Sequence, residues 1–329
     1  MSSPGPYRWL RHVGWDGVRK EISLRERCFG GPLRKAPLEM PSGGTFTRSR
    51  RVVLMVHGFG VNLCRAGDEF ENFTSELPFR WQGRTVWFYW PGDATSSRAG
   101  SEQPGLLDKA ITRATYHLQH GKTEPSATAV VDLIANAAPV RKFPIRLTVI
   151  AHSLGCLITL HLLNQLRGLQ KNGQVKLELV VLMAAAVPQY ACRPGEIHDL
   201  AQFPDTKFVV YYSKHDGVLQ YAFGPGQLTV STGSKTRFSG RGAIGRSGLA
   251  AGAHTHVEQI QKQNGHSEYW SDREIAIDLA ERLDGNTRPT ARRFLVPRLL
   301  GSGRDVQGRS LKGRSVQSAS GVRRACTCP

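Results

Sequence analysis

The chain has 329 residues, of which 40% are hydrophobic and 21% charged, and its formal net charge is +18. This length and composition predict a globular protein with a sizeable core, built as one large α/β domain with appendages or as two smaller domains. No window approaches the ~18 consecutive apolar residues of a membrane-spanning helix, and the N-terminus lacks the apolar stretch of a signal peptide. We therefore expect a soluble, cytoplasmic protein.

The six cysteines are widely scattered, and only Cys326 and Cys328 lie close together in the sequence. A single C-x-C pair makes a poor zinc site without two further ligands nearby, so reduced thiols are expected. The GFG at residues 58–60 is not a G-x-G-x-x-G fingerprint, and the sequence has no G-x-x-x-x-G-K-[ST] pattern, so nucleotide binding has no support. We therefore expect neither a metal nor an organic cofactor.

The two ends of the chain differ from its middle. Residues 1–50 are rich in Arg, Pro and Gly, which predicts an irregular arm with one or two short edge strands. Residues 285–329 contain ten Lys or Arg and a single acid, a composition typical of a solvated, disordered tail. Weak contact of this tail with nucleic acid or an anionic surface stays open. Because Phe294 is its only aromatic residue, we expect no specific nucleic-acid binding.

Apolar strands and helices alternate from residue 51 onward. The predicted elements of the first half are a strand at 51–60, a helix at 66–77, a strand at 84–93, helices near 105–118 and 127–137, a strand at 145–151 and a buried helix at 154–169. Those of the second half are strands at 177–188 and 207–217, a long loop at 221–253, a short strand at 254–261 and a helix at 271–283.

The last helix begins with Ser271 three residues before Glu274, which predicts a capping box. Strands that are apolar throughout and separated by helices indicate a mostly parallel, doubly wound sheet with helices on both faces. We assign this α/β domain to residues 51–284.

The segment LTVIAHSLG, residues 147–155, places a serine between a buried strand and a buried helix. Ser153 has a small residue two positions before it, Ala151, and another two positions after it, Gly155. This is the pattern of a nucleophile elbow, in which the serine adopts a positive φ and its Oγ points off the end of the sheet. The two small residues are expected to approach each other, and His152 and Leu154 to point away and be free to vary.

The segment HGFG, residues 57–60, ends the first apolar strand. A loop in this position and the residue after the nucleophile commonly supply the two N–H groups of an oxyanion hole. Here these would be the backbone N–H groups of Phe59 and Leu154. We expect His57 to have a structural role, hydrogen-bonding this loop into shape.

Together with YSKHDGVL (212–219) and GHSEYW (265–270), these motifs resemble the esterase- and lipase-like serine hydrolases of the α/β-hydrolase superfamily. The resemblance covers about residues 50–284, with the motifs in the family's order. Ala151 replaces the commoner glycine, a conservative change because the turn requires only a small residue. FYWPGD (88–93) is similar to a segment of uncharacterised bacterial hydrolases.

The resemblance implies a catalytic triad in the chain order serine, acid, histidine. Asp216 directly follows a predicted strand, where the family has its acid. Asp199 and Asp205 are competitors, but both precede that strand and are expected to have surface roles.

The resemblance also implies a histidine on the loop after the last strand, and His266 lies there, just before the final helix. His254 and His256 also follow Asp216. They stand at the start of the last predicted strand, which is the wrong end of the sheet for the site.

The resulting hypothesis is a hydrolase of a carboxylic ester, with a thioester or lipid ester as possible substrates. Ser153 would attack the carbonyl of a small-molecule acyl ester, His266 would act as the base and Asp216 would orient it, through an acyl-enzyme. Two alternatives stay open. One is acyl transfer, and the other is a non-catalytic binding or scaffold protein that uses its basic tail.

Overall fold

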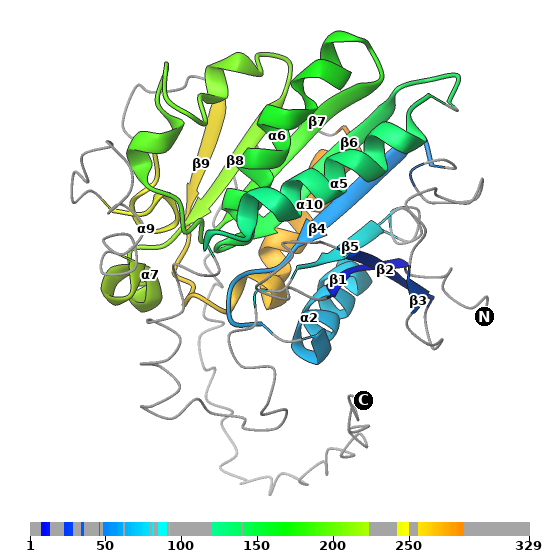
Figure 1. Ribbon diagram of the computed structural model, residues 1–329. Helices are drawn as coiled ribbons and strands as arrows, with labels where there is room; N and C mark the ends of the chain where they lie inside the picture. Colours follow the sequence, from blue (N-terminus) through cyan, green and yellow to red (C-terminus); the bar gives the residue numbers. More distant parts are fainter. Residues whose placement is uncertain are drawn as a thin grey trace, which may run out of the picture.

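A computed structural model gives the fold of the chain (Figure 1). It describes the backbone of residues 8–13, 23–28 and 34–35, and then residues 46, 49–61, 63–78, 81, 85–90, 92, 120–139, 141–223, 242–249 and 256–285. The predicted helix at 105–118, most of the predicted loop at 221–253 and the basic tail after residue 285 lie outside the described residues.

One nine-stranded sheet runs through the molecule in the order β3-β2-β1-β5-β4-β6-β7-β8-β9. Six consecutive strands, which end at the edge strand β9, are parallel: β5 (Thr85–Tyr89), β4 (Arg51–Val56), β6 (Ile145–His152), β7 (Val175–Met183), β8 (Lys207–Tyr212) and β9 (Val257–Gln261). The predicted arm contributes three strands rather than the expected one or two short edge strands. They extend the sheet beyond β5: β1 (Arg8–Val13), which pairs with β5 in parallel, β2 (Ser23–Cys28) and the edge strand β3 (Arg34–Lys35). The doubly wound α/β architecture expected from the sequence is the observed one.

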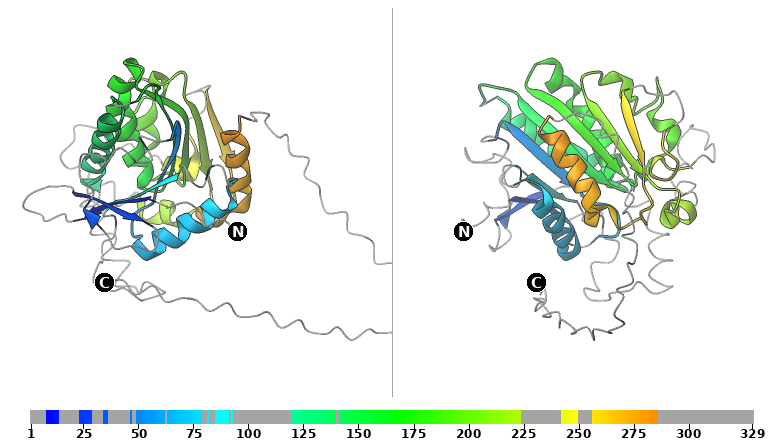
Figure 2. Two further views of the ribbon diagram at one scale, coloured as in Figure 1. Left: turned by 90° about the vertical axis from the view of Figure 1, so that its right-hand side faces the viewer. Right: turned by 180° about the vertical axis from the view of Figure 1, so that it is seen from behind.

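Helices cover both faces of the sheet (Figures 1 and 2). One face carries α5 (Thr123–Ala137) and α6 (Gly155–Lys171), and the other carries α2 (Leu63–Glu76) and α10 (Arg273–Leu283). Shorter helices connect the later strands: η1 (Gln189–Cys192), η2 (Leu200–Gln202), α7 (Gly217–Tyr221), α9 (Ile244–Ser247) and η4 (Tyr269–Ser271).

Two apolar cores lie on the two faces, and β4 shows how one strand serves both. Its side chains alternate between the faces because successive Cβ atoms of a strand point in opposite directions. Val52, Leu54 and Val56 enter the core beneath α5 and α6, whereas Val53 and Met55 enter the core beneath α2 and α10. A strand covered on both faces must be apolar throughout, which is the pattern that predicted the parallel sheet.

Several predicted boundaries are wrong. The strands predicted at 51–60, 84–93 and 207–217 end at Val56, Tyr89 and Tyr212, and two further differences have clear local reasons. β7 ends at Met183 rather than near residue 188, because Ala184 adopts a left-handed φ of 45° that interrupts the extended strand. The predicted capping box is also wrong: the N-cap of α10 is Asp272, whose carboxylate accepts from the N–H groups of Glu274 and Ile275. Ser271 instead donates from Oγ to the carbonyl of Glu268, at 3.0 Å.

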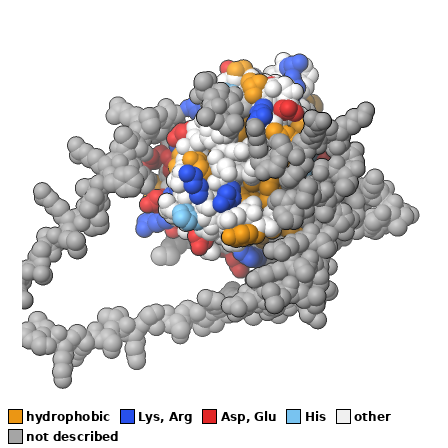
Figure 3. Space-filling model, turned by 90° about the vertical axis from the view of Figure 1, so that its left-hand side faces the viewer, with side chains coloured by type: hydrophobic (Ala, Val, Ile, Leu, Met, Phe, Trp, Pro, Cys, Tyr) orange, Lys and Arg blue, Asp and Glu red, His pale blue; other side chains and the backbone are white. Residues whose placement is uncertain are grey.

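The described surface mixes charges of both signs. On the face drawn in Figure 3, Lys and Arg side chains are interspersed with Asp and Glu. None of the helices that the structure describes is long and apolar enough to span a membrane. Within the same residues, no cluster of three or more His, Cys, Asp or Glu side chains is arranged to bind a metal ion. Cys156 and Cys192 are buried and form no disulfide with any residue that the structure describes.

Candidate active site

Ser153 occupies the turn between β6 and α6, as the elbow pattern predicts. Its φ is 53°, a conformation that is strained for any residue with a side chain. The end of β7 holds this turn in place. The N–H of Ser153 donates to the carbonyl of Met183 at 2.9 Å, and its own carbonyl accepts from the N–H of Ala186 at 3.1 Å.

The reason for the small residue at 155 differs from the one expected. A Cβ on Gly155 would lie 2.4 Å from the carbonyl oxygen of His57 and 2.9 Å from that of Val56. The end of β4, rather than Ala151, therefore requires a glycine at this position. Gly58 is similarly constrained, since a Cβ there would lie 2.8 Å from Ser153 Cβ.

Asp216 follows β8 and is the N-cap of α7. Its side chain is fully buried, and both carboxylate oxygens have partners. Oδ1 accepts from the N–H of Leu219 at 2.9 Å, and Oδ2 lies 2.7 Å from Nδ1 of His266. Because the helix cap holds one oxygen, the other is directed at the histidine.

His266 lies on the loop between β9 and η4 and contacts both other residues. Its Nε2 lies 2.9 Å from Ser153 Oγ, across 113 positions of sequence. A carboxylate can only accept, so Nδ1 donates to Asp216 and Nε2 is left with a lone pair that faces the serine hydroxyl. The structure thus brings Ser153, His266 and Asp216 into one continuous chain of hydrogen bonds.

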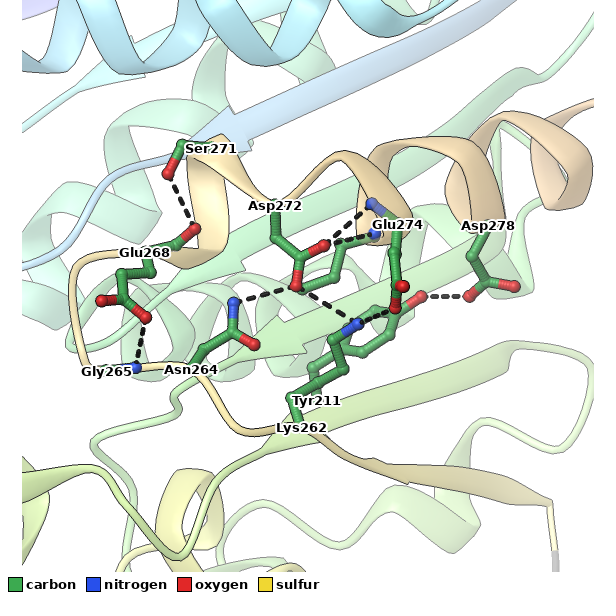
Figure 4. Close-up of polar contacts among 10 residues, drawn as sticks. Tyr211, Lys262, Asn264, Gly265, Glu268, Ser271, Asp272, Glu274 and Asp278 are labelled. Atoms are coloured by element: carbon green, nitrogen blue, oxygen red, sulfur yellow. Dashed lines mark hydrogen bonds and ion pairs between the residues drawn. The ribbon is translucent and has the colours of Figure 1, made fainter. Parts of the chain in front are cut away.

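Polar contacts brace the loop that carries His266 (Figure 4). Asn264 donates to Asp272 Oδ2 at 2.9 Å, and the N–H of Gly265 donates to Glu268 Oε2 at 2.7 Å. Lys262 pairs with Asp272 at 3.2 Å and with Glu274 at 2.9 Å. Asp272, which caps α10, therefore also holds the start of this loop through its contacts with Lys262 and Asn264.

The two predicted oxyanion-hole residues, Phe59 and Leu154, directly follow Gly58 and Ser153 in the chain. The backbone of Gly58, which leads into Phe59, packs against Ser153 Cβ. Leu154 is the N-cap of α6, where backbone N–H groups have no partner within the helix and the positive end of the dipole lies.

His57 has the structural surroundings that its place in the HGFG segment predicts. Its ring is fully buried and stacks on Trp90, with centroids 5.7 Å apart. Nε2 accepts from the backbone N–H of Trp90, Nδ1 donates to Gly58 O, and the Trp90 indole donates to the carbonyl of His57 at 2.8 Å. Burial lowers the pKa of His57 to about 4. A neutral His57 therefore joins the ends of β4 and β5.

The competing residues have other partners. Asp199 is buried and accepts from the N–H groups of Gly195 and Ala201, so it stabilises a turn and does not have the expected surface role. Asp205 is exposed. His256 stands just before β9, with Nε2 3.1 Å from the carbonyl of Leu200. His254 lies outside the described residues.

His152 does not behave as the elbow pattern predicts. The pattern leaves this residue pointing away and free to vary, but it is buried and its Nε2 lies 2.6 Å from the backbone oxygen of His266. Leu154, expected to vary as well, is fully buried in the core. The sequence holds no signal for the His152 contact, because it joins segments that are 114 positions apart.

Comparisons with solved structures find, among others, a thioesterase domain and a carboxylesterase at low similarity. One is the NocB thioesterase domain, which was solved as a covalent complex with a fluorophosphonate nocardicin G analogue. It is 11% identical to this chain and has a TM-score of 0.38, and the match covers 73% of this chain and 96% of the thioesterase domain. Carboxylesterase CesB from Bacillus subtilis is 12% identical, with 85% and 92% covered and a TM-score of 0.39. No curated protein matches the chain.

A family model gives the stronger result. The model described as "Alpha/beta hydrolase of unknown function (DUF900)" matches residues 45–228. The match covers more than half of the chain and includes the 57–60 loop, the elbow and Asp216. The chain therefore belongs to the DUF900 family of α/β hydrolases.

Proposed function

We propose that the protein is a serine hydrolase that cleaves a carboxylic ester, thioester or lipid ester through an acyl-enzyme. The observation that carries this proposal is the chain of hydrogen bonds from Asp216 through His266 to Ser153 Oγ, at 2.7 and 2.9 Å. Ser153 has a positive φ of 53° and lies on a strand-to-helix turn. Backbone strain of this kind concentrates at functional sites, where the surrounding structure maintains it.

In the proposed reaction, Ser153 Oγ attacks the acyl carbonyl while His266 Nε2 takes the hydroxyl proton. The developing oxyanion accepts from the N–H groups of Phe59 and Leu154. The C–O or C–S bond then breaks, and His266 returns the proton to the leaving group. Water, deprotonated by His266, next attacks the acyl-enzyme, and the proton goes back to Ser153 as the acid is released.

The buried position of Asp216 suits this role. A fully buried carboxylate next to His266 stabilises the positive charge that the imidazole acquires at the transition state, because little water screens the pair. Transfer of the acyl group to an alcohol instead of water uses the same residues and the same first step.

Reaction with a fluorophosphonate probe tests the proposal without knowledge of the substrate, since the probe needs only an activated serine. The wild-type chain should label, and Ser153→Ala should not. Asp216→Asn keeps an oxygen that can cap α7 and should slow labelling by roughly 10⁴-fold. Ser75→Ala, at an exposed serine of α2, is the control and should label like the wild type. Labelling that persists in Ser153→Ala would overturn the proposal.

A further inference from the structure

We infer that His152 is a positioning residue that holds the loop carrying His266 against the nucleophile, an inference that rests on the proposed function. Its Nε2 lies 2.6 Å from the backbone oxygen of His266, and Ser153 is the next residue along the chain. One hydrogen bond therefore joins the peptide segment of the nucleophile to that of its base. Such a bond sets the separation of Ser153 and His266 more directly than contacts elsewhere in the loop.

The partners of His152 determine its tautomer. A carbonyl oxygen can only accept, so Nε2 carries the proton and Nδ1 carries the lone pair. Nδ1 is buried and has no hydrogen-bond partner among the residues that the structure describes. It faces Gly58, where an added Cβ would lie 2.8 Å away. A buried polar atom without a partner is destabilising, and the bond to His266 offsets part of that cost.

The surroundings of the ring keep it neutral. Burial, followed by repulsion from His266, lowers the pKa of His152 to about 3. Arg65 of α2 and His57 are the other charged or titratable groups that oppose its protonation. The rings of His152 and His266 have centroids 5.0 Å apart. A second imidazole of ordinary basicity at that distance would compete for the serine proton, whereas His152 leaves His266 as the single base.

The ring also supports the far end of the loop. It packs against Tyr269 and Trp270 of η4, with centroids at 5.9 and 6.2 Å, and both of these aromatic side chains are buried. His152 thus contacts the loop at His266 itself and at the helical turn that follows.

Three substitutions separate this role from simple packing. His152→Phe keeps a buried ring but removes the donor. His152→Gln places an amide N–H at about the reach of Nε2, and His152→Asn carries an amide too short to reach His266. Each full-length variant is compared with the wild type by thermal unfolding, by the rate of fluorophosphonate labelling, and by proton NMR of the downfield signal from the Nδ1–H that His266 shares with Asp216.

His152→Phe and His152→Asn should label roughly 100-fold more slowly, the effect expected of misplacing a base by about 1 Å, and should lose the downfield signal. His152→Gln should restore most of the rate and the signal. Wild-type rate and signal in His152→Phe would overturn the inference, as would equal losses in His152→Gln and His152→Phe. If the wild-type chain does not label, the proposed function fails, and the NMR signal alone still decides whether His152 positions His266.

Discussion

Gly58 packs so closely against Ser153 that a Cβ on the glycine would lie 2.8 Å from the Cβ of the serine. Real Cβ atoms do not approach backbone-anchored carbons this closely, so one of the two segments would have to move. We predict that Gly58→Ala slows fluorophosphonate labelling by roughly 100-fold, because it displaces the nucleophile or the neighbouring Phe59 N–H. Labelling at the wild-type rate would contradict this prediction. It would show that the segments after β4 and β6 can move apart without slowing the reaction.

Two glycines of α6 should respond in opposite directions to the same substitution. A Cβ on Gly168 would meet only open space, so Gly168→Ala should raise the free energy of unfolding by about 0.5–1 kcal/mol through its better helix propensity. Gly155→Ala would place Cβ 2.4 Å from the carbonyl oxygen of His57 and should be strongly destabilising. Urea unfolding of both variants measures the two changes in the free energy of unfolding. Equal changes would contradict the prediction that only Gly155 is held against the end of β4.

Ala184 shares the left-handed conformation of Ser153, with φ of 45° against 53°. Glycine adopts this conformation without a steric penalty, so Ala184→Gly should stabilise the fold by up to about 1 kcal/mol. Gly245→Ala is the opposing variant, because its Cβ would lie 2.1 Å from the backbone of Ala184 and Ala185. Thermal unfolding should rank Ala184→Gly above the wild type and Gly245→Ala far below it.

The cap of α10 can be identified by a pair of alanine variants. Asp272→Ala removes the acceptor for two helix N–H groups and should cost about 1 kcal/mol or more of stability. Ser271→Ala removes one exposed hydrogen bond to Glu268 and should change stability by less than about 0.5 kcal/mol. The reverse order of effects would favour the capping box at Ser271.

Buried histidines should make the fold sensitive to acid. Burial is the main cause that lowers the pKa of five histidines to about 3 or 4: His57, His120, His152, His161 and His198. Between about pH 6.5 and 4 the unfolded chain binds protons at these sites and the folded chain does not. Stability should therefore fall as the pH falls through this range, by at most about 1.4 kcal/mol per pH unit for each site.

His198→Asn tests this titration at one position. The ring nitrogen Nδ1 of His198 lies 3.1 Å from Nδ2 of Asn164, and an asparagine oxygen can accept the same bond without titrating. We expect the melting temperature of the wild type to drop between pH 7 and 5, and the variant to show a shallower drop. A wild-type melting temperature that stays constant over this range would contradict the prediction.

Local patterns were sufficient to predict the main strands and helices and the elbow. Apolar runs identified β4, β5, β6, β7 and β8 because strands covered on both faces cannot alternate with polar residues. The positive φ of Ser153 followed from small residues at fixed spacing. Asp216 and His266 were selected by their place relative to predicted strands, and the structure joins both to the serine through hydrogen bonds.

The errors have a common cause. Ser271 and Asp272 are both good caps by type, and only the path of the loop that Lys262 and Asn264 hold decides which carboxylate or hydroxyl faces the helix N–H groups. A surface role was expected for Asp199 because its turn partners could not be seen from the sequence.

By itself, the sequence predicted the fold class, the order of the main elements and the strand-to-helix turn at Ser153, since each element and the turn depend on residues that are close together in the chain. The tertiary structure decided which glycines must remain glycine and what His152 does. Gly58 and Gly155 are constrained by strands that approach from elsewhere in the chain, and His152 gains its partner only when the loop after β9 reaches the end of β6. Such contacts depend on how distant segments pack, and no local pattern records them.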